Sequence, residues 1–314
     1  MRPFVWKPGN GIDPKALKRL QDVFPPPAQP MGEAWFMGER RIFHELTGDI
    51  ASLTVSQLQK VLESISSGAS CFGLYDEWND WYHHLLGHLI PRSHACWVDP
   101  LLEYLVTAFF ALYPDGLNKP PYRNFDEDVL NTLGRCMMEP ECWDGNDIAV
   151  GRVLHRSPRP NKLWGWWDAS GDFSASMFLC LKYLPPDLIE SWFKSVLAIP
   201  SPHWRAQLLV WLVGAHGFFT GKIRWPSELR NDAYPSVDWA WSHCLRADMA
   251  SSSDVTGFLP RAAGKIVLET AYRHFTEDVY LDWIGSISAI AYLETELALI
   301  PATFESLYMK HGEI

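Results

Sequence analysis

Apolar side chains recur with helical spacing along this 314-residue chain, and that spacing constrains the fold more than any other feature. Leu58, Val61, Leu62 and Ile65 stand at positions i, i+3, i+4 and i+7, so all four share one face of a helix. The spacing returns in several later segments. Sustained alternation with a period of two is absent, and we find no pair of strands flanking a two-residue turn. The sequence therefore predicts an all-α fold of about ten to thirteen helices, given the mean helix length.

Capping residues mark where several of these helices should begin. A capping side chain followed by proline is typical of the first helical turn. This pattern occurs at Asp13-Pro14, Asp99-Pro100 and Ser201-Pro202. Thr54 and Gln57 have the spacing of a capping box, in which each side chain bonds to the backbone of the other residue.

Two stretches interrupt the helical pattern and divide the chain. Residues 24–32 form a proline-rich connector, and residues 140–172 read as a long irregular loop. We therefore expect an N-terminal helix and connector over residues 1–32. A single α-helical domain would follow over residues 33–314 and contain the long loop.

One pair of predicted helices has the organisation of a repeat. A helix over Pro186–Ala198, a short turn, and a more apolar helix over Pro202–Gly217 follow one another. This stretch, near residues 186–220, resembles a HEAT-like repeat in its pattern, although no self-similarity with a period of about 40 residues runs through the chain. The resemblance implies antiparallel helical hairpins stacked as an irregular HEAT-like α-solenoid. It also implies that the protein binds another protein through a concave or edge surface.

The segment from Asp76 to His88 is the strongest candidate for chemistry. Asp80, His84 and His88 follow one another at steps of four residues, so a helix places them on one face. Carboxylate and imidazole suit Zn, Fe or Mn, which makes these three residues candidate metal ligands. Ligands on successive turns of a straight helix do not all converge on one ion, and the metalloprotease pattern lacks its glutamate. Acid–histidine pairing along a wet helix face explains the same spacing without a metal.

Asp76, Glu77 and Asp80 also resemble the aspartate-rich motif of class I terpene synthases. That resemblance implies an all-α enzyme that binds a diphosphate through Mg²⁺. The second metal-binding motif of such enzymes fails here, because Pro235 follows Asn231 where a serine should stand.

A basic run followed by tryptophans is the second candidate surface. Arginine and tryptophan dominate the energetics of many interfaces. The candidate binding residues are Arg156, Arg159, Trp164, Trp166 and Trp167. A plug of tryptophans folded over the core, with solvated arginines, is an equal alternative. The chain holds 16 tryptophans, and those within helical segments are expected in the core.

The net charge and the cysteines limit which classes of binding partner and which cellular compartment fit this sequence. The net charge is −10, which disfavours nucleic acid and anionic membranes and favours a basic protein partner. No apolar stretch reaches the length of a membrane span, and residues 1–8 lack the apolar core of a secretory signal. The six cysteines are scattered without metal-binding spacing, so we expect reduced thiols in the cytoplasm.

No complete catalytic motif is present in the sequence. We therefore expect a non-enzymatic, protein-binding scaffold without a cofactor, and one concrete version is an immunity-type protein that neutralises a basic toxin. The alternative is an all-α enzyme that uses a divalent metal on the Asp76–His88 face.

Overall fold

A computed structural model of the chain describes residues 3–34, 38–68, 75–93, 101–149, 170–229, 237, 239, 241–249, 256–290 and 300–309. Eleven α-helices and one two-stranded sheet lie within these ranges. The all-α prediction is confirmed.

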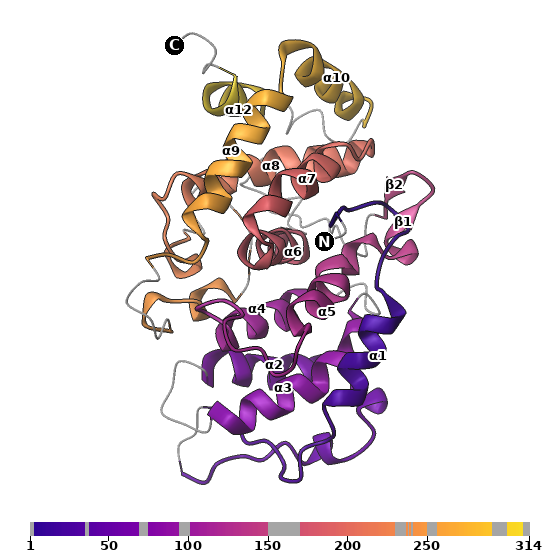
Figure 1. Ribbon diagram of the computed structural model, residues 1–314, viewed down its shortest axis with the longest axis vertical. Helices are drawn as coiled ribbons and strands as arrows, with labels where there is room; N and C mark the ends of the chain where they lie inside the picture. The colour runs from indigo at the N-terminus through magenta and orange to yellow at the C-terminus, as the bar shows by residue number, and fades with distance from the viewer. Residues whose placement is uncertain are drawn as a thin grey trace.

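The helices follow one another along the long axis of the molecule (Figure 1). The lower part holds α1 (Pro14–Val23), α2 (Val55–Gly68), α3 (Tyr75–Leu89), α4 (Leu102–Leu112) and α5 (Phe125–Asn131). The middle and upper parts hold α6 (Ser170–Tyr183), α7 (Pro186–Leu197), α8 (Pro202–Phe219), α9 (Arg261–His274), α10 (Glu277–Ser288) and α12 (Ile300–Tyr308).

The expected helix starts carry the expected caps. The Asp13 carboxylate accepts from the Lys15 N–H at 2.8 Å, and α1 begins at the proline between them. Gln57 Oε1 accepts from the Thr54 N–H at 2.9 Å while Thr54 Oγ1 accepts from the Gln57 N–H at 3.3 Å, which completes the capping box of α2. Ser201 is the N-cap of α8, and its side chain accepts from the Trp204 N–H. The Asp99-Pro100 start lies outside the described residues.

One hydrophobic core connects the lower and upper parts, because the most apolar helices lie at the centre. The α4 helix packs against α2 on one side and α6 on the other, and α6 in turn contacts α8. The α8 helix is apolar nearly all round, as its sequence predicts, and most of its residues are buried. The core extends from Phe4 to Tyr308.

The helix pair with the repeat-like pattern packs differently from a simple hairpin. α7 lies mainly against α9 rather than against α8, while α8 contacts α9, α10 and α12. Trp6, which comes from far away in the sequence, contacts Trp192 of α7 and Trp204 of α8. Trp204 of α8 also donates its indole N–H to the Val196 carbonyl of α7 at 3.0 Å, so Trp6 packs beside a direct contact between the two helices.

The prediction of an entirely irregular loop over 140–172 is wrong at its start. Strands β1 (Trp143–Asp144) and β2 (Asp147–Ile148) pair in antiparallel fashion around a two-residue turn. Gly145 in this turn has φ +62°, a conformation that favours glycine. The Gly145-Asn146 turn signal was present in the sequence, but each strand is too short to show alternation. Residues 150–169 of this segment lie outside the described ranges.

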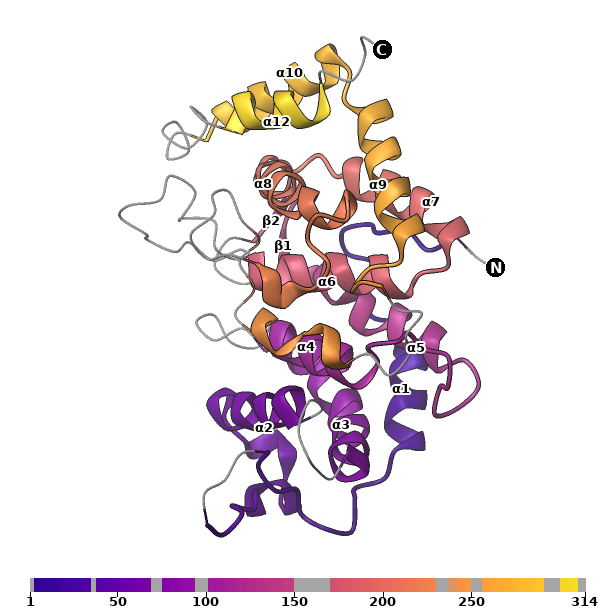
Figure 2. The ribbon, with the colours of Figure 1, turned by 90° about the vertical axis from the view of Figure 1, so that its left-hand side faces the viewer.

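Residues 3–13 form an arm that runs from the middle of the molecule, at the level of α6, down to α1 (Figure 2). Phe4 and Trp6 of this arm are buried. The Trp6 N–H donates to Ser195 Oγ at 2.8 Å, and its indole N–H donates to the Gly134 carbonyl at 2.9 Å. The guanidinium of Arg135 lies 4.5 Å from the centre of the Phe4 ring. The arm is therefore part of the core.

The helix tryptophans are core residues, as expected. All six tryptophans expected in the core are buried: Trp81, Trp192, Trp204, Trp211, Trp239 and Trp283. Trp239 lies outside any described helix and donates to Thr107 Oγ1 at 2.9 Å. Within the described part of the chain, the indole N–H groups of Trp192 and Trp211 have no acceptor, contrary to the expectation that each buried indole finds one.

Among the helices that the structure describes, none has the length and apolar character needed to cross a bilayer.

Candidate functional site

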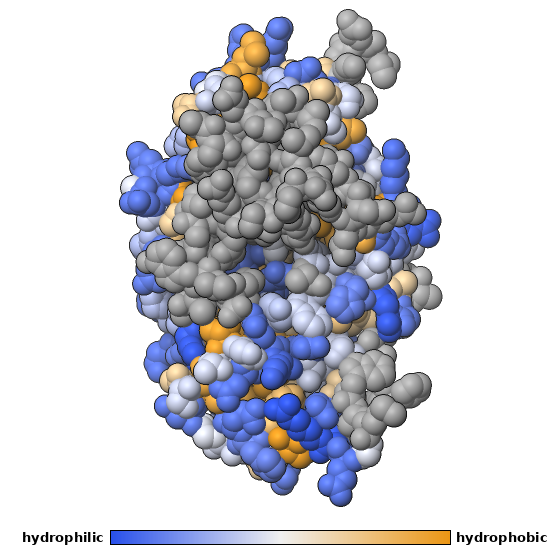
Figure 3. Space-filling view, turned by 180° about the vertical axis from the view of Figure 1, so that it is seen from behind, coloured by the Kyte–Doolittle hydropathy of each residue, from blue (hydrophilic) through white to orange (hydrophobic). Residues whose placement is uncertain are grey.

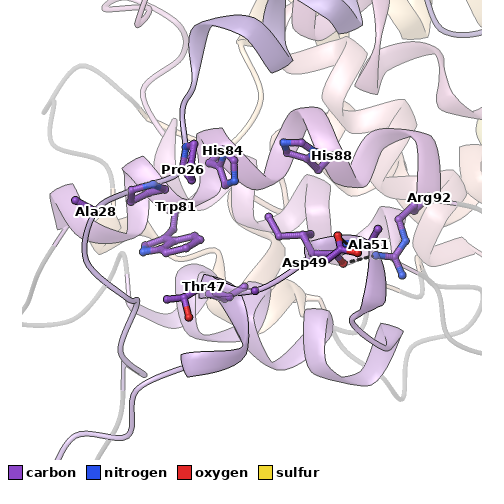
Figure 4. Close-up of a pocket in the computed structure, with 13 residues that line it drawn as sticks. Pro26, Ala28, Thr47, Asp49, Ala51, Trp81, His84, His88 and Arg92 are labelled. Atoms are coloured by element: carbon purple, nitrogen blue, oxygen red, sulfur yellow. Dashed lines mark hydrogen bonds between the residues drawn. The ribbon is translucent and has the colours of Figure 1, made fainter.

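Two of the three predicted metal ligands share one pocket. His84 and His88 lie one turn apart on α3, and their ring centres are 4.9 Å apart. Figure 4 shows both rings on the wall of a pocket of about 480 Å³. The opposite wall includes Asp49 and Arg92, whose guanidinium donates to the carbonyls of Ile50 and Leu53. These two bonds fix the loop that forms that wall.

The hydrogen bond of His84 determines which ring nitrogen is a donor. Its Nδ1 lies 3.0 Å from the Phe24 carbonyl oxygen, and a carbonyl only accepts, so Nδ1 carries the proton. In the neutral ring Nε2 then carries the lone pair. Partial burial and the neighbouring His84 lower the pKa of His88, which favours its neutral form at pH 7.

Asp80 lies apart from this pair, in a neighbouring pocket of about 680 Å³. The connector residues Pro26, Pro27 and Ala28 line both pockets and so stand between them. Across the parts of the chain that the structure describes, no three His, Cys, Asp or Glu side chains are grouped as metal ligands. The structure thus brings His84 and His88 together and leaves Asp80 outside the pair.

His83 is a site residue that the sequence analysis missed. Its ring stacks on Phe24 at 4.5 Å, and its Nε2 lies 2.5 Å from the Tyr113 hydroxyl. Burial lowers the pKa of His83 to about 4, so the ring is neutral and its Nε2 accepts a hydrogen bond from the Tyr113 hydroxyl. His83 and His84 therefore hold Phe24 from two sides. Their adjacency in the sequence gave no sign of this, because the partner lies 60 residues away.

The acidic motif similar to that of terpene synthases is partly occupied by protein. Glu77 accepts from Arg40 Nη2 at 2.8 Å and from the Gly32 N–H at 2.8 Å. A carboxylate held in this way by a guanidinium is a poor ligand for Mg²⁺. The second position of the motif therefore fixes Gly32, which pairs with Ile42 in an isolated β-bridge, to α3.

A groove beside the arm was not anticipated from the sequence. This arm groove, of about 660 Å³, lies between residues 3–14, α5 and the start of α7. Its apolar lining includes Phe4, Leu130 and Leu188, and its acidic lining consists of Asp13, Asp126 and Glu127. All three acids are exposed. Among the described residues, neither Asp126 nor Glu127 forms an ion pair.

The single base in the groove is already engaged. Arg135 donates to the Val5 carbonyl at 2.9 Å and to Asn131 Oδ1 at 3.2 Å, in addition to covering Phe4. Its charge is therefore directed at the arm. The groove presents an acidic rim over an apolar floor, and Asp13 is held beside α5 by the bond from its N–H to the Asn131 carbonyl at 2.9 Å.

Two buried acids meet at the start of α6. Asp172 accepts from the Glu103 N–H at 2.8 Å, and both residues are buried. Burial raises the pKa of Asp172 to about 7. Perturbed acids of this kind occur at functional sites and also in structural cores. The bond to the first turn of α4 gives Asp172 a structural role here.

Three of the described cysteines are poor nucleophiles. Cys136, Cys142 and Cys180 are free and buried, and burial raises the pKa of each thiol, that of Cys136 to about 12. Thiols of this kind remain protonated at neutral pH. The Cys244 thiol is free and lies 3.6 Å from His243 Nε2.

The basic and tryptophan candidates Arg156, Arg159, Trp164, Trp166 and Trp167 lie outside the described residues. They remain a prediction.

Comparison with protein-family models, with curated proteins and with solved structures finds no match for this chain.

Proposed function

We propose that this protein is a non-enzymatic α-helical scaffold that binds a basic protein partner, and that the arm groove is its docking site. The observation that carries the proposal is the unpaired acidic rim of Asp126 and Glu127 above the apolar floor formed by Phe4 and Leu188. A lysine or arginine stem packs on an apolar floor while its charged end meets carboxylates at the rim.

The rest of the described surface favours docking through charge. The large apolar side chains exposed within the described ranges are Val23, Tyr75 and Leu281, which lie on different helices. In Figure 3 the coloured part of the rear face is mostly hydrophilic, with hydrophobic residues in small separate spots. A partner that relied on a broad apolar interface would find little to cover there.

The HEAT-like organisation belongs to the same proposal. The α2, α4 and α6 helices pack one after another, as successive layers of an irregular α-solenoid would. Stacked layers leave their ends and edges open to a partner. An immunity-type protein that neutralises a basic toxin is one concrete version. A pull-down from the native host that yields no protein partner with sub-micromolar affinity would count against it.

The direct test uses a labelled octa-arginine peptide as a defined basic probe and measures fluorescence anisotropy at low and high salt. The D126N/E127Q variant removes two rim charges from the first turn of α5. The matched control, E277Q/D278N, removes two exposed charges from the first turn of α10. Both variants change the net charge equally and remove acids from equivalent helix positions.

Rim charges contribute about 0.2–1 kcal/mol each, so the α5 variant should bind the peptide about two- to thirty-fold more weakly. The control should retain most of its affinity. Equal losses of peptide affinity in the two variants would mean that binding depends only on net charge, and the proposed docking site would be wrong.

A metal-dependent enzyme that uses the Asp76–His88 face is the alternative. Its terpene-synthase version needs Glu77 as a ligand, and Arg40 holds that carboxylate. Mg²⁺-dependent release of pyrophosphate from a prenyl diphosphate would support the enzyme and overturn the scaffold.

A further inference from the structure

The pair His84 and His88 has the geometry of two ligands for one transition-metal ion. An imidazole nitrogen binds Zn²⁺ at about 2.0–2.1 Å, which puts the ring centre about 3.2 Å from the ion. Two ring centres 4.9 Å apart then subtend an angle of about 100° at a shared ion. This angle lies between those of octahedral and tetrahedral coordination.

The ring of His84 is held in the orientation that a ligand needs. Metal-binding histidines usually donate their other N–H to a carbonyl or carboxylate, which fixes the tautomer and makes the binding nitrogen more basic. The Phe24 carbonyl accepts from His84 Nδ1 in this way. Phe24 is itself held by its stacking on His83, so the acceptor is fixed as well.

The surroundings leave room for an ion and for water. The two rings line the pocket of about 480 Å³, and His88 is exposed at its edge. Among the described residues that line the pocket, Asp49 is the acid, and its carboxylate offsets part of the Arg92 charge, which is directed at the loop carbonyls. Asp49 is engaged by the Ala51 N–H at 2.9 Å and would meet the ion through water.

We propose that His84 and His88 form a two-imidazole site for a borderline transition-metal ion such as Ni²⁺, Cu²⁺ or Zn²⁺. Water fills its remaining coordination positions. Neutral imidazole suits these ions and not Mg²⁺ or Ca²⁺, which prefer oxygen ligands. The site is independent of the arm groove, so either proposal can fail alone.

The test titrates the full-length protein with Ni²⁺ by isothermal titration calorimetry. Nickel is chosen because the thiols elsewhere in the chain compete more strongly for zinc. H88A removes an exposed ligand and should fold normally. H84N keeps an N–H donor for the Phe24 carbonyl while it removes the binding nitrogen. H44A removes another exposed histidine and serves as the control.

We expect one Ni²⁺ site that H88A and H84N each weaken by about tenfold or more, as is typical when a metal site loses a supporting group. H44A should leave that site unchanged. The electron paramagnetic resonance spectrum of bound Cu²⁺ should show coupling to two imidazole nitrogens in the wild type and to one in H88A. Unchanged nickel titration in both H88A and H84N, with native circular dichroism, would overturn the proposal.

Discussion

Replacing Trp6 with alanine should destabilise the whole molecule, because this side chain joins its two parts. Its exposed fraction is 2%, and its ring lies 5.4 Å from that of Trp192 and 6.0 Å from that of Trp204. Each of these edge contacts contributes about 0.5–1.5 kcal/mol beyond burial. Loss of the indole donor leaves the Gly134 carbonyl with the weak Cys180 thiol donor at 3.7 Å, at a cost of about 1–3 kcal/mol.

These contributions agree with the loss of about 3–5 kcal/mol in the free energy of unfolding that follows replacement of a buried tryptophan by alanine. We therefore expect W6A to lower the free energy of unfolding by that amount. W6F should lose less, because it keeps a ring between the two partner tryptophans and removes mainly the bond to Gly134. V23A changes a side chain that is 44% exposed and should stay within about 0.5 kcal/mol of the wild type.

The assay is urea unfolding followed by far-ultraviolet circular dichroism, since tryptophan fluorescence changes with the mutation itself. The midpoint should fall while the slope m stays constant. A loss below 1 kcal/mol for W6A would show that the arm lies on the upper part without stabilising it.

Three further changes test buried or capping groups by denaturation. Burial raises the pKa of Asp172 to about 7, so the folded state keeps a proton that the unfolded state releases above about pH 4. The stability that the neutral carboxyl gives the folded state is lost as the pH rises through 7. The free energy of unfolding of D172N should therefore rise relative to that of the wild type by up to about 4 kcal/mol between pH 4 and pH 8. A difference between the two proteins that does not depend on pH would contradict this. Lys182 Nζ donates to the carbonyls of Pro114 and Phe258 at 2.8 and 2.7 Å, and K182M should cost about 1–3 kcal/mol; a variant as stable as the wild type would refute that role. T54A removes half of the α2 capping box and should cost about 1 kcal/mol, measured as a shift in the urea midpoint.

Local signals in the sequence predicted several helix starts, because the groups that interact are close in the chain. Asp13 caps a nitrogen two residues away, and Thr54 with Gln57 spans three residues. The shared face of His84 and His88 follows from helical geometry in the same way. The hairpin at Gly145 also had a local signal, but strands of two residues give no periodicity to detect.

The contacts that build the candidate sites join residues far apart in the chain. The acceptor that orients His84 belongs to Phe24, and the arm that lines the groove is anchored by the bonds from Trp6 to Gly134 and Ser195. Periodicity shows that a tryptophan is buried, but it contains no information about the surface that buries it. The packing of α7 on α9 was missed for the same reason.

The position of the arm in the core has a consequence during synthesis. Trp6 and Ser195, which bond to each other, are separated by 189 positions. A ribosome adds about 5–20 residues per second, so roughly 10 to 40 s pass between the appearance of the two partners. During that interval Phe4 and Trp6 lack the surface that buries them. The nascent chain therefore carries exposed aromatic residues for a holding chaperone to bind, and burial of the arm waits for α7 and α8.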